Sequence, residues 1–209
     1  MSDLFEQQKR DAIAANAPLA VQLRPVTLDE ILGQDHFLGP GKLLRRMLEA
    51  GNVTSLVFYG PPGTGKTTLA SVVANYSDCE FHTLNAASTS VKQVREIIER
   101  AKTTLASSGQ RTVLFIDELH RFNRAQQDVL LGDVENGVIL LIGATTENPF
   151  FTINTPLLSR STIFEFHSLT PEDIVALLRR AISDEERGLG RFNIDYTDEA
   201  LEHIATISD

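Results

Sequence analysis

The chain has 209 residues, of which 42% are hydrophobic and 22% are charged, and its formal net charge is −9. This composition predicts a globular protein with one sizeable core, and the charge argues against strong non-specific nucleic-acid binding by the whole chain, though not against a local basic strip. No apolar run reaches membrane-spanning length, and the polar N-terminus has no signal-peptide core. The single cysteine, Cys79, excludes an internal disulfide and fits a reducing compartment.

Strands and helices are expected to alternate along most of the chain. Residues 1–22 form a polar, partly helical lead-in, and a short helix with basic outer residues follows at Leu43–Leu48. The short apolar runs that predict strands are Leu56–Tyr59, Phe81–Leu84, Thr112–Ile116, Val138–Ile142 and Ile163–Phe166. The segments that predict helices are Lys66–Tyr76, Val91–Leu105, Arg124–Leu131, Pro171–Glu186 and Asp198–Ile207. For residues 23–168 this order predicts an α/β fold, a doubly wound five-stranded parallel sheet that binds ligands at the carboxyl ends of its strands.

The pattern changes after Phe166. Thr170 precedes Pro171 and two acidic residues, which is typical of a helix N-cap and first turn. Two helices without an intervening strand bury little surface by themselves. We therefore expect residues 169–209 to begin a small helical lid domain, and the chain to be an N-terminal fragment of a longer protein.

The most specific motif is a glycine-rich loop between an apolar strand and a helix. It fits the phosphate-binding pattern G-x-x-x-x-G-K-[ST]. Its glycines permit backbone torsions that turn successive N–H groups toward a phosphate, and the helix that follows adds its positive end. In this pattern the lysine contacts the β- and γ-phosphates of ATP and the last hydroxyl joins the Mg²⁺ shell. The residues are Gly60, Pro61, Pro62, Gly63, Thr64, Gly65, Lys66 and Thr67.

Two acids end the strand Thr112–Ile116. In phosphate-loop proteins an acid at this place holds Mg²⁺ directly or through water, which makes Asp117 the candidate. Glu118 follows at the strand tip, where a carboxylate can orient or deprotonate an attacking water. Without the phosphate loop, both would be interpreted as solvated acids in a turn.

Two further segments carry polar residues at strand ends. Thr145–Asn148 follows a buried strand, so its side chains can reach a γ-phosphate or the attacking water, although in isolation it is only a polar turn. Arg160 precedes the last strand. Taken alone it is an ordinary surface arginine, but in an oligomeric ATPase it can act on a neighbour's γ-phosphate as an arginine finger.

The motifs, in order, also carry a family resemblance. Gly60–Thr67, Phe115–Asn123, Ile142–Pro149 and Leu158–Ser161 together resemble the AAA+ ATPases of the clamp-loader and branch-migration-motor group. Within this group the chain is most similar to the replication-associated recombination protein A family, also called MgsA, whose relatives include the Werner-helicase-interacting ATPases. Matching signatures also occur at Arg24-Pro25 and Gly33–His36, so that the resemblance extends from about Leu23 to Asp209.

The resemblance implies roles for individual residues. Lys66 and Thr67 correspond to the Walker A pair and Asp117 and Glu118 to the Walker B pair, with ATP and Mg²⁺ as ligands. Thr146 occupies the sensor 1 position, with Asn148 as an alternative, and Arg160 matches the arginine finger. The implied nucleotide contacts further include Thr68 beside the phosphates and Ile31, Leu32 and Gln34 around the adenine base.

The family also implies a setting for this activity. It suggests an ATPase of the bacterial cytosol or nucleoid that is stimulated by DNA, forms a homo-oligomer, specifically a tetramer, and works with replication or repair proteins at stalled or damaged forks. Two departures qualify this picture. Gly132 interrupts a helical pattern. The sensor 2 arginine and the tetramer-forming region lie beyond Asp209 in the family, so we expect a fragment like this to hold ATP but to hydrolyse it poorly.

The helix predicted after Ser90 is the candidate DNA-binding element. Its apolar face comprises Val91, Val94, Ile97, Ile98 and Leu105, while Lys92, Arg95 and Arg100 lie largely off this face. In clamp-loader-like rings the corresponding helix faces the central channel. Lys92 and Arg95 are therefore DNA-contact candidates, on a par with the interpretation as a solvated face that also carries Glu96 and Glu99, and for Arg100 we favour the solvated face.

Two other functions fit parts of the pattern. A small-molecule kinase can use the same phosphate loop, but the adjacent acids Asp117 and Glu118 favour water as the acceptor. A nucleotide-gated DNA-binding scaffold with little turnover is the alternative outside the enzymes. Stimulation of ATP hydrolysis by DNA distinguishes the ATPase from the scaffold.

Overall fold

The structure is a computed structural model that describes residues 17–208, so most of the expected lead-in lies outside the described residues. These residues fall into two compact units. The larger unit runs from Val26 to Ser168, and the second combines the chain up to Pro25 with the chain from Leu169 onward. In the described part of the chain, no helix has the length and apolar character needed to cross a membrane.

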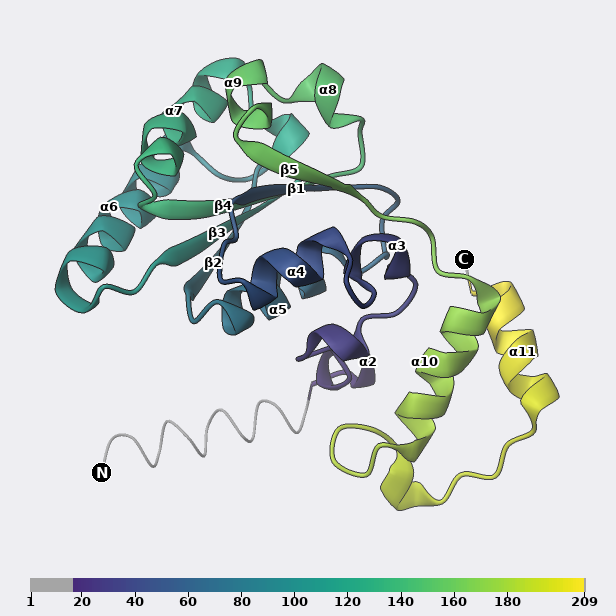
Figure 1. Ribbon diagram of the computed structural model, residues 1–209. Coiled ribbons are helices and arrows are strands. Elements are labelled where there is room, and N and C mark those ends of the chain that lie inside the picture. Colours follow the sequence, from purple (N-terminus) through teal and green to yellow (C-terminus); the bar gives the residue numbers. More distant parts are fainter. Residues whose placement is uncertain (1–16, 209) are drawn as a thin grey trace. The chain divides into compact units, whose positions relative to one another are not determined.

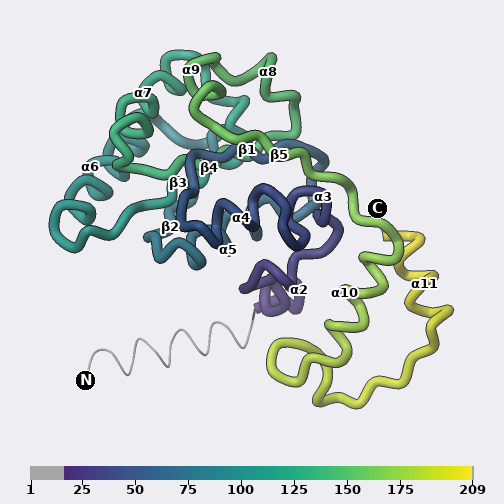
Figure 2. Tube along the Cα trace, in the orientation of Figure 1, coloured from purple at the N-terminus to yellow at the C-terminus, as the bar shows by residue number. Residues whose placement is uncertain are grey.

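The larger unit contains the predicted five-stranded sheet, and all of its strand pairs are parallel. The strands lie in the order β2-β3-β4-β1-β5, so β1 is flanked by β4 and β5 (Figure 2). Tyr59, the last residue of β1, pairs with Thr145 of β4 and Glu165 of β5. Their bounds are β1 Ser55–Tyr59, β2 Glu80–Asn85, β3 Thr112–Asp117, β4 Ile139–Thr145 and β5 Ser161–Glu165.

Helices cover both faces of this sheet (Figure 1). Side chains alternate between the faces, so Leu56 and Phe58 of β1 enter one apolar cluster with α4 and α5, whereas Val57 enters the other. The second cluster includes Val94 and Ile98 of α6, which confirms the predicted apolar face of that helix. The helices are α4 Leu43–Glu49, α5 Lys66–Tyr76, α6 Val91–Ser108, α7 Arg124–Glu135, α8 Pro149–Thr152 and α9 Thr155–Leu158, with short turns η1 Leu28–Glu30, α3 Asp35–Leu38 and η2 Leu119–Arg121.

Capping residues explain where two long helices begin. The Ser90 hydroxyl accepts the N–H of Gln93 and starts α6, and Thr170 accepts the N–H of Asp173 and starts α10. In each case the N3 side chain binds back to the N-cap, which completes a capping box. Both predicted helix starts are therefore confirmed.

Several predicted ends were wrong. The helix starting at Arg124 continues through Gly132 to Glu135, because this glycine is exposed and has no neighbouring atoms that disturb the helix. The fourth strand extends past the predicted Ile142 to Thr145, since its backbone stays paired with β1. The last strand is Ser161–Glu165 rather than Ile163–Phe166, because its pairing with β1 begins at Ser161.

The second unit is helical. Besides α2 (Leu19–Gln22), it contains α10 Pro171–Ser183, a turn η3 at Gly190–Phe192, and α11 Asp198–Ile207, which packs on α10. The prediction extended α10 to Glu186, but the Asp184 carboxylate accepts the N–H groups of Glu186 and Arg187. This turn replaces the helical hydrogen bonds and ends the helix three residues early.

Candidate active site

The phosphate loop leaves β1 at Gly60. This glycine has φ 143° and donates its N–H to the Thr145 carbonyl of β4 at 3.2 Å. A Cβ atom here would lie 2.3 Å from the Phe166 carbonyl oxygen, so that no other residue fits without displacing the chain. Gly65 ends the loop with φ 93° as the N-cap of α5. The glycines thus allow the tight, cradle-shaped backbone that the motif predicts.

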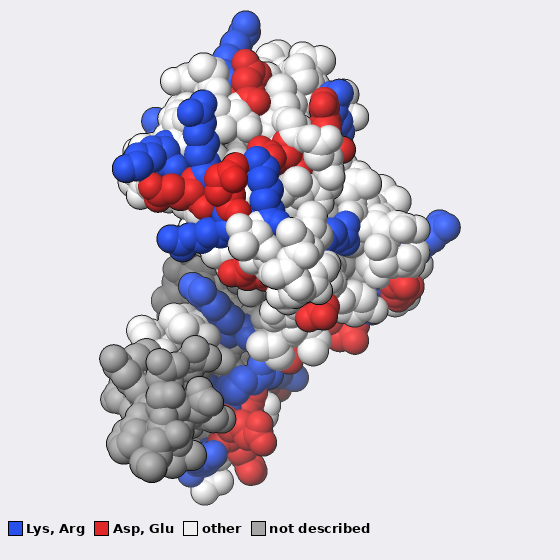
Figure 3. All heavy atoms as spheres, turned by 90° about the vertical axis from the view of Figure 1, so that its left-hand side faces the viewer, with Lys and Arg blue, Asp and Glu red and all other residues white. Residues whose placement is uncertain are grey.

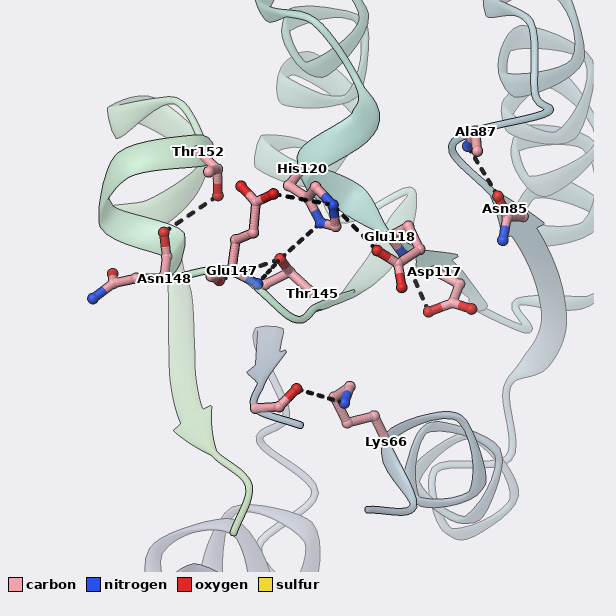
Figure 4. Close-up of polar contacts among 11 residues, drawn as sticks. Lys66, Asn85, Ala87, Asp117, Glu118, His120, Thr145, Glu147, Asn148 and Thr152 are labelled. Carbon is pink, nitrogen blue, oxygen red and sulfur yellow. Dashed lines mark hydrogen bonds and ion pairs between the residues drawn. The ribbon is translucent and has the colours of Figure 1, made fainter. Parts of the chain in front are cut away.

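Lys66 begins α5 and lies beneath the loop. It is 8% exposed, and its Nζ donates hydrogen bonds to the carbonyl oxygens of Gly60 and Pro61, at 2.9 Å and 2.5 Å. Burial lowers the pKa of the Lys66 ammonium, and the carboxylates of Asp117 and Glu118 oppose this shift. The lysine therefore lies between the phosphate loop and the two acids, as Figure 4 shows.

The two acids lie at the carboxyl end of β3. Asp117 ends the strand, and its carboxylate accepts the backbone N–H of Glu118 at 3.0 Å. Glu118 has φ 54°, a left-handed conformation that is rare for residues other than glycine and costs about 1–3 kcal/mol. This turn sets the direction of the Glu118 side chain, which is one-third exposed.

A histidine joins Glu118 to the end of β4, a contact that sequence reasoning missed (Figure 4). His120, in η2, places Nε2 3.2 Å from a Glu118 carboxylate oxygen and 3.6 Å from Glu147 Oε1. Its Nδ1 lies 3.0 Å from the Thr145 hydroxyl. The sequence gives no local signal for this contact, because His120 and Thr145 are 25 residues apart.

The predicted sensor residues lie at the same edge of the sheet. Thr146 follows β4 directly and is exposed. Asn148, the alternative, is also exposed, but its side-chain oxygen accepts the N–H of Phe150 and caps α8. The side chain of Asn148 is thus engaged in local structure, which favours Thr146 as the residue available to a ligand.

The structure also allows a test of whether magnesium fits. Among residues 17–208, no group of three or more His, Cys, Asp or Glu side chains could hold a metal by itself. Thr67 is exposed on the first turn of α5, the helix that follows β1. Asp117 ends β3, which is separated from β1 in the sheet by β4. Mg²⁺ commonly uses one or two protein oxygens together with phosphate oxygens and water, so that this sparse pair fits the ion when a nucleotide is bound.

Arg160 lies at the opposite edge of the sheet from these residues. It immediately precedes β5, and in a parallel sheet the start of a strand lies opposite the carboxyl ends. Its guanidinium pairs with Glu135 at 2.6 Å and donates to the Pro156 carbonyl and Ser159 hydroxyl. Arg160 is therefore not brought together with the other predicted catalytic residues of the same chain.

The segment predicted to wrap adenine is held against β5. Gln34 is 1% exposed, and its side-chain amide exchanges two hydrogen bonds with the backbone of His167. This pairing uses both ends of the amide, so the Gln34 side chain supports the segment and is not free for a base. Ile31 and Leu32 are partly buried, and Ile31 packs against the core.

The candidate DNA contacts lie on a face of mixed charge. Lys92 is exposed, and its Nζ lies 3.9 Å from the carboxylate of Glu96, one turn along α6. Arg95 is also exposed and forms no ion pair within the described residues. Figure 3, which views the side of the larger unit that carries α6 and α7, shows basic and acidic residues interspersed. This arrangement lends no special support to a strong basic strip.

The model of the AAA family, ATPases associated with various cellular activities, matches residues 56–169. These residues contain the phosphate loop, the acid pair and Arg160. The chain therefore belongs to the AAA family of ATPases, and its predicted α/β fold is confirmed.

Individual relatives narrow this class. The chain is 47% identical over 190 residues to replication-associated recombination protein A of Escherichia coli, covering 91% of this chain and 42% of that protein. It is 53% identical over 178 residues to an uncharacterised AAA domain-containing protein of Mycobacterium tuberculosis, covering 85% of this chain and 39% of that protein. These matches confirm the resemblance to the replication-associated recombination protein A family. The chain spans about two fifths of the length of these relatives.

A solved structure supports the same grouping. The Holliday junction branch migration motor RuvB of Thermotoga maritima aligns with a TM-score of 0.69 and 29% identity, over 88% of this chain and 59% of that chain. The predicted similarity to a branch-migration motor is thus confirmed at the level of fold.

Proposed function

We propose that this chain is the ATP-hydrolysing motor domain of a protein that maintains DNA during replication and recombination. The observation that carries the proposal is the meeting of three strand ends at one edge of the sheet. There the phosphate loop after β1 faces the acids of β3 and the polar end of β4. A phosphate loop with a carboxylate opposite it provides both a binding site for the nucleotide and a group to direct water.

The residues divide the chemistry among themselves. The loop N–H groups and Lys66 bind the phosphates, with Thr68 beside them, while Thr67 and Asp117 would hold Mg²⁺, which supplies positive charge to the phosphate oxygens when bound. Glu118 orients the attacking water or accepts its proton. Thr146, exposed beside Glu147, is the proposed contact to the γ-phosphate.

Arg160 extends the site to a neighbouring subunit. Because it lies at the edge of the sheet away from its own phosphate loop, it is suited to serve the nucleotide of another copy. We propose a homo-oligomer, a tetramer by analogy with the family, in which each site is completed across an interface. A division into a lead-in (1–22), an ATPase core (23–168) and the start of a helical lid domain (169–209) is part of this proposal.

The biological role rests on the relatives. We propose replication or repair proteins as partners, and forked or single-stranded DNA as the partner that stimulates hydrolysis. Lys92 and Arg95 are the candidate contacts, with Arg95 the less encumbered of the two because Lys92 faces Glu96. The proposed location is the bacterial cytosol, at the nucleoid.

The test uses two variants of the full-length protein. Lys66→Ala removes the charge that meets the phosphates and is expected to abolish nucleotide binding, measured by titration with a fluorescent ATP analogue. Glu118→Gln keeps the shape of the side chain, and we expect unchanged binding with ATP hydrolysis reduced at least about 100-fold. Normal hydrolysis by Glu118→Gln would show that the catalytic assignment is wrong.

DNA stimulation is measured in the same assay. The rate of phosphate release is compared with and without forked and single-stranded DNA at low salt, where backbone contacts are strongest. A several-fold increase supports a DNA-driven motor. A flat response, with binding retained, would instead favour a nucleotide-gated scaffold.

A further inference from the structure

We propose that His120 is a positioning residue that fixes the carboxylate of Glu118 by joining it to the end of β4. The inference rests on the proposed function, because it assigns a role in directing the Glu118 carboxylate toward water. The side chain of His120 is only 5% exposed, although the residue lies in a short turn at the rim of the site. Such burial of a polar ring requires partners on both nitrogens.

The partners of the ring determine where its proton lies. Nε2 faces the carboxylates of Glu118 and Glu147, at 3.2 Å and 3.6 Å, and a lone pair there would be repelled by both. A proton on Nε2 therefore faces the Glu118 carboxylate and attracts it electrostatically. The Thr145 hydroxyl, 3.0 Å from Nδ1, accepts the backbone N–H of Glu147 and can donate its single proton either to Nδ1 or to the Glu147 carbonyl oxygen, 3.2 Å away.

Glu118 needs such a partner. Its left-handed backbone sets the origin of the side chain, but three rotatable bonds still separate that backbone from the carboxylate. In the described part of the chain, the polar contact of the Glu118 carboxylate is the one with His120 Nε2. A carboxylate that is one-third exposed would otherwise sample several rotamers, and a displacement of about 1 Å from the reactive geometry can lower a rate about 100-fold.

The turn that carries His120 is itself firmly held. The residues that flank His120 and Arg121 in the chain are Leu119 and Phe122, and both are buried in the core. Leu119 packs over Gly143 of β4, where a Cβ atom would lie 2.4 Å from its Cδ2. The buried side chains of Leu119 and Phe122 and the packing of Leu119 on Gly143 hold the backbone of the turn, and the contact with Thr145 holds the imidazole itself. This makes it a rigid support rather than a mobile side chain.

The test compares two substitutions that each keep one arm of the ring. The amide nitrogen of glutamine reaches about as far as Nε2, whereas that of asparagine reaches about as far as Nδ1. In the full-length protein, His120→Gln is expected to keep kcat for ATP hydrolysis within about 3-fold. His120→Asn should lower kcat about 10- to 100-fold, with KM and the nucleotide Kd unchanged.

A second histidine provides the control. His82 on the edge strand β2 also pairs with a glutamate, Glu80, at 2.8 Å, but in mid-strand, away from the carboxyl ends. His82→Gln and His82→Asn should leave kcat equal to that of the wild type. In the Glu118→Gln background, His120→Asn should have no further effect, because the group it positions has already been removed.

Equal kcat values for His120→Gln and His120→Asn would overturn the proposal, whether both are high or both low. A nucleotide Kd that weakens in parallel with kcat would also overturn it, since the histidine would then support the site as a whole. These results are distinct from a failure of the proposed function, which is indicated by an active Glu118→Gln protein.

Discussion

Gly60 lies where three segments of the larger unit meet. Its N–H donates to the carbonyl oxygen of Thr145 in β4, and the carbonyl oxygen of Phe166 occupies the place that a Cβ atom would take. The N–H of Phe166 in turn donates to the carbonyl oxygen of Tyr59 at 2.7 Å. The absence of a side chain therefore matters here for space as well as for backbone torsion. In the other loop glycines, Gly63 and Gly65, only the torsion is special, because no atom lies near the Cβ position.

Gly60→Ala is expected to lower the free energy of unfolding by about 3 kcal/mol, from backbone strain and the overlap with Phe166. Urea denaturation of the nucleotide-free protein measures the change. The matched control is Gly51→Ala, which has φ 67° but open space around it and should cost about 1 kcal/mol. Equal losses for the two variants would contradict the steric part of the argument.

Among the elements, η2 packs closely on β4 because Gly143 of that strand has no side chain. Gly143→Ala would drive a Cβ into Leu119, which is fully buried and can yield only by moving the turn. We expect a stability loss of about 1–3 kcal/mol. Since η2 also carries His120 and follows Glu118, kcat for ATP hydrolysis should fall while the nucleotide Kd stays the same.

Gly132→Ala is the control for this substitution. This glycine lies inside α7 with nothing near its Cβ position, and alanine there should stabilise the protein by about 0.5–1 kcal/mol. Thermal unfolding and a phosphate-release assay measure both variants. If Gly143→Ala left both the melting temperature and kcat unchanged, η2 would not depend on this close approach.

Some helices and strands could be predicted from the sequence, and others could not. The strands β1 and β3 and the helix α5 could be predicted because each has a continuous apolar run or face, and α6 and α10 because capping residues mark their starts. The four-residue helices α8 and α9 could not, since one turn has no periodicity to detect.

The residues of the candidate site also fall into those that could be predicted from the sequence and those that could not. The phosphate loop, Asp117 and Glu118 were found because their residue types follow one another in the chain. The bridge from Glu118 through His120 to Thr145 was missed because His120 and Thr145 are 25 residues apart in the chain. The family resemblance implies a place for Gln34 beside adenine, whereas the contact of its side-chain amide with the backbone of His167, 133 residues away, has no local sequence signal.

For the whole molecule, the position of Arg160 predicts complementation between defective subunits. Lys66→Ala and Arg160→Ala should each be inactive in the full-length protein, the first without nucleotide and the second without the residue given to its neighbour. When they are mixed and allowed to exchange, a Lys66→Ala subunit can supply Arg160 to an Arg160→Ala site. We therefore expect partial recovery of phosphate release.

A second mixture tests whether recovery depends on the interface. Lys66→Ala and Glu118→Gln both damage the same site within one chain, so no combination of them forms a complete site. This mixture should stay inactive. Recovery there, or none with Arg160→Ala, would contradict the assignment of Arg160 to the neighbouring subunit.

The order of the strands has a consequence for how the protein is made. β1 lies in the interior of the sheet, but the strands on its two sides begin only at Ile139 and Ser161. On the ribosome, the glycine loop therefore leaves the exit tunnel long before the carbonyl of Thr145 or the backbone of Phe166 is available to hold it. Because these late contacts are the ones that fix Gly60, the larger unit is expected to assemble slowly and all at once, after nearly all of its sequence has been synthesised.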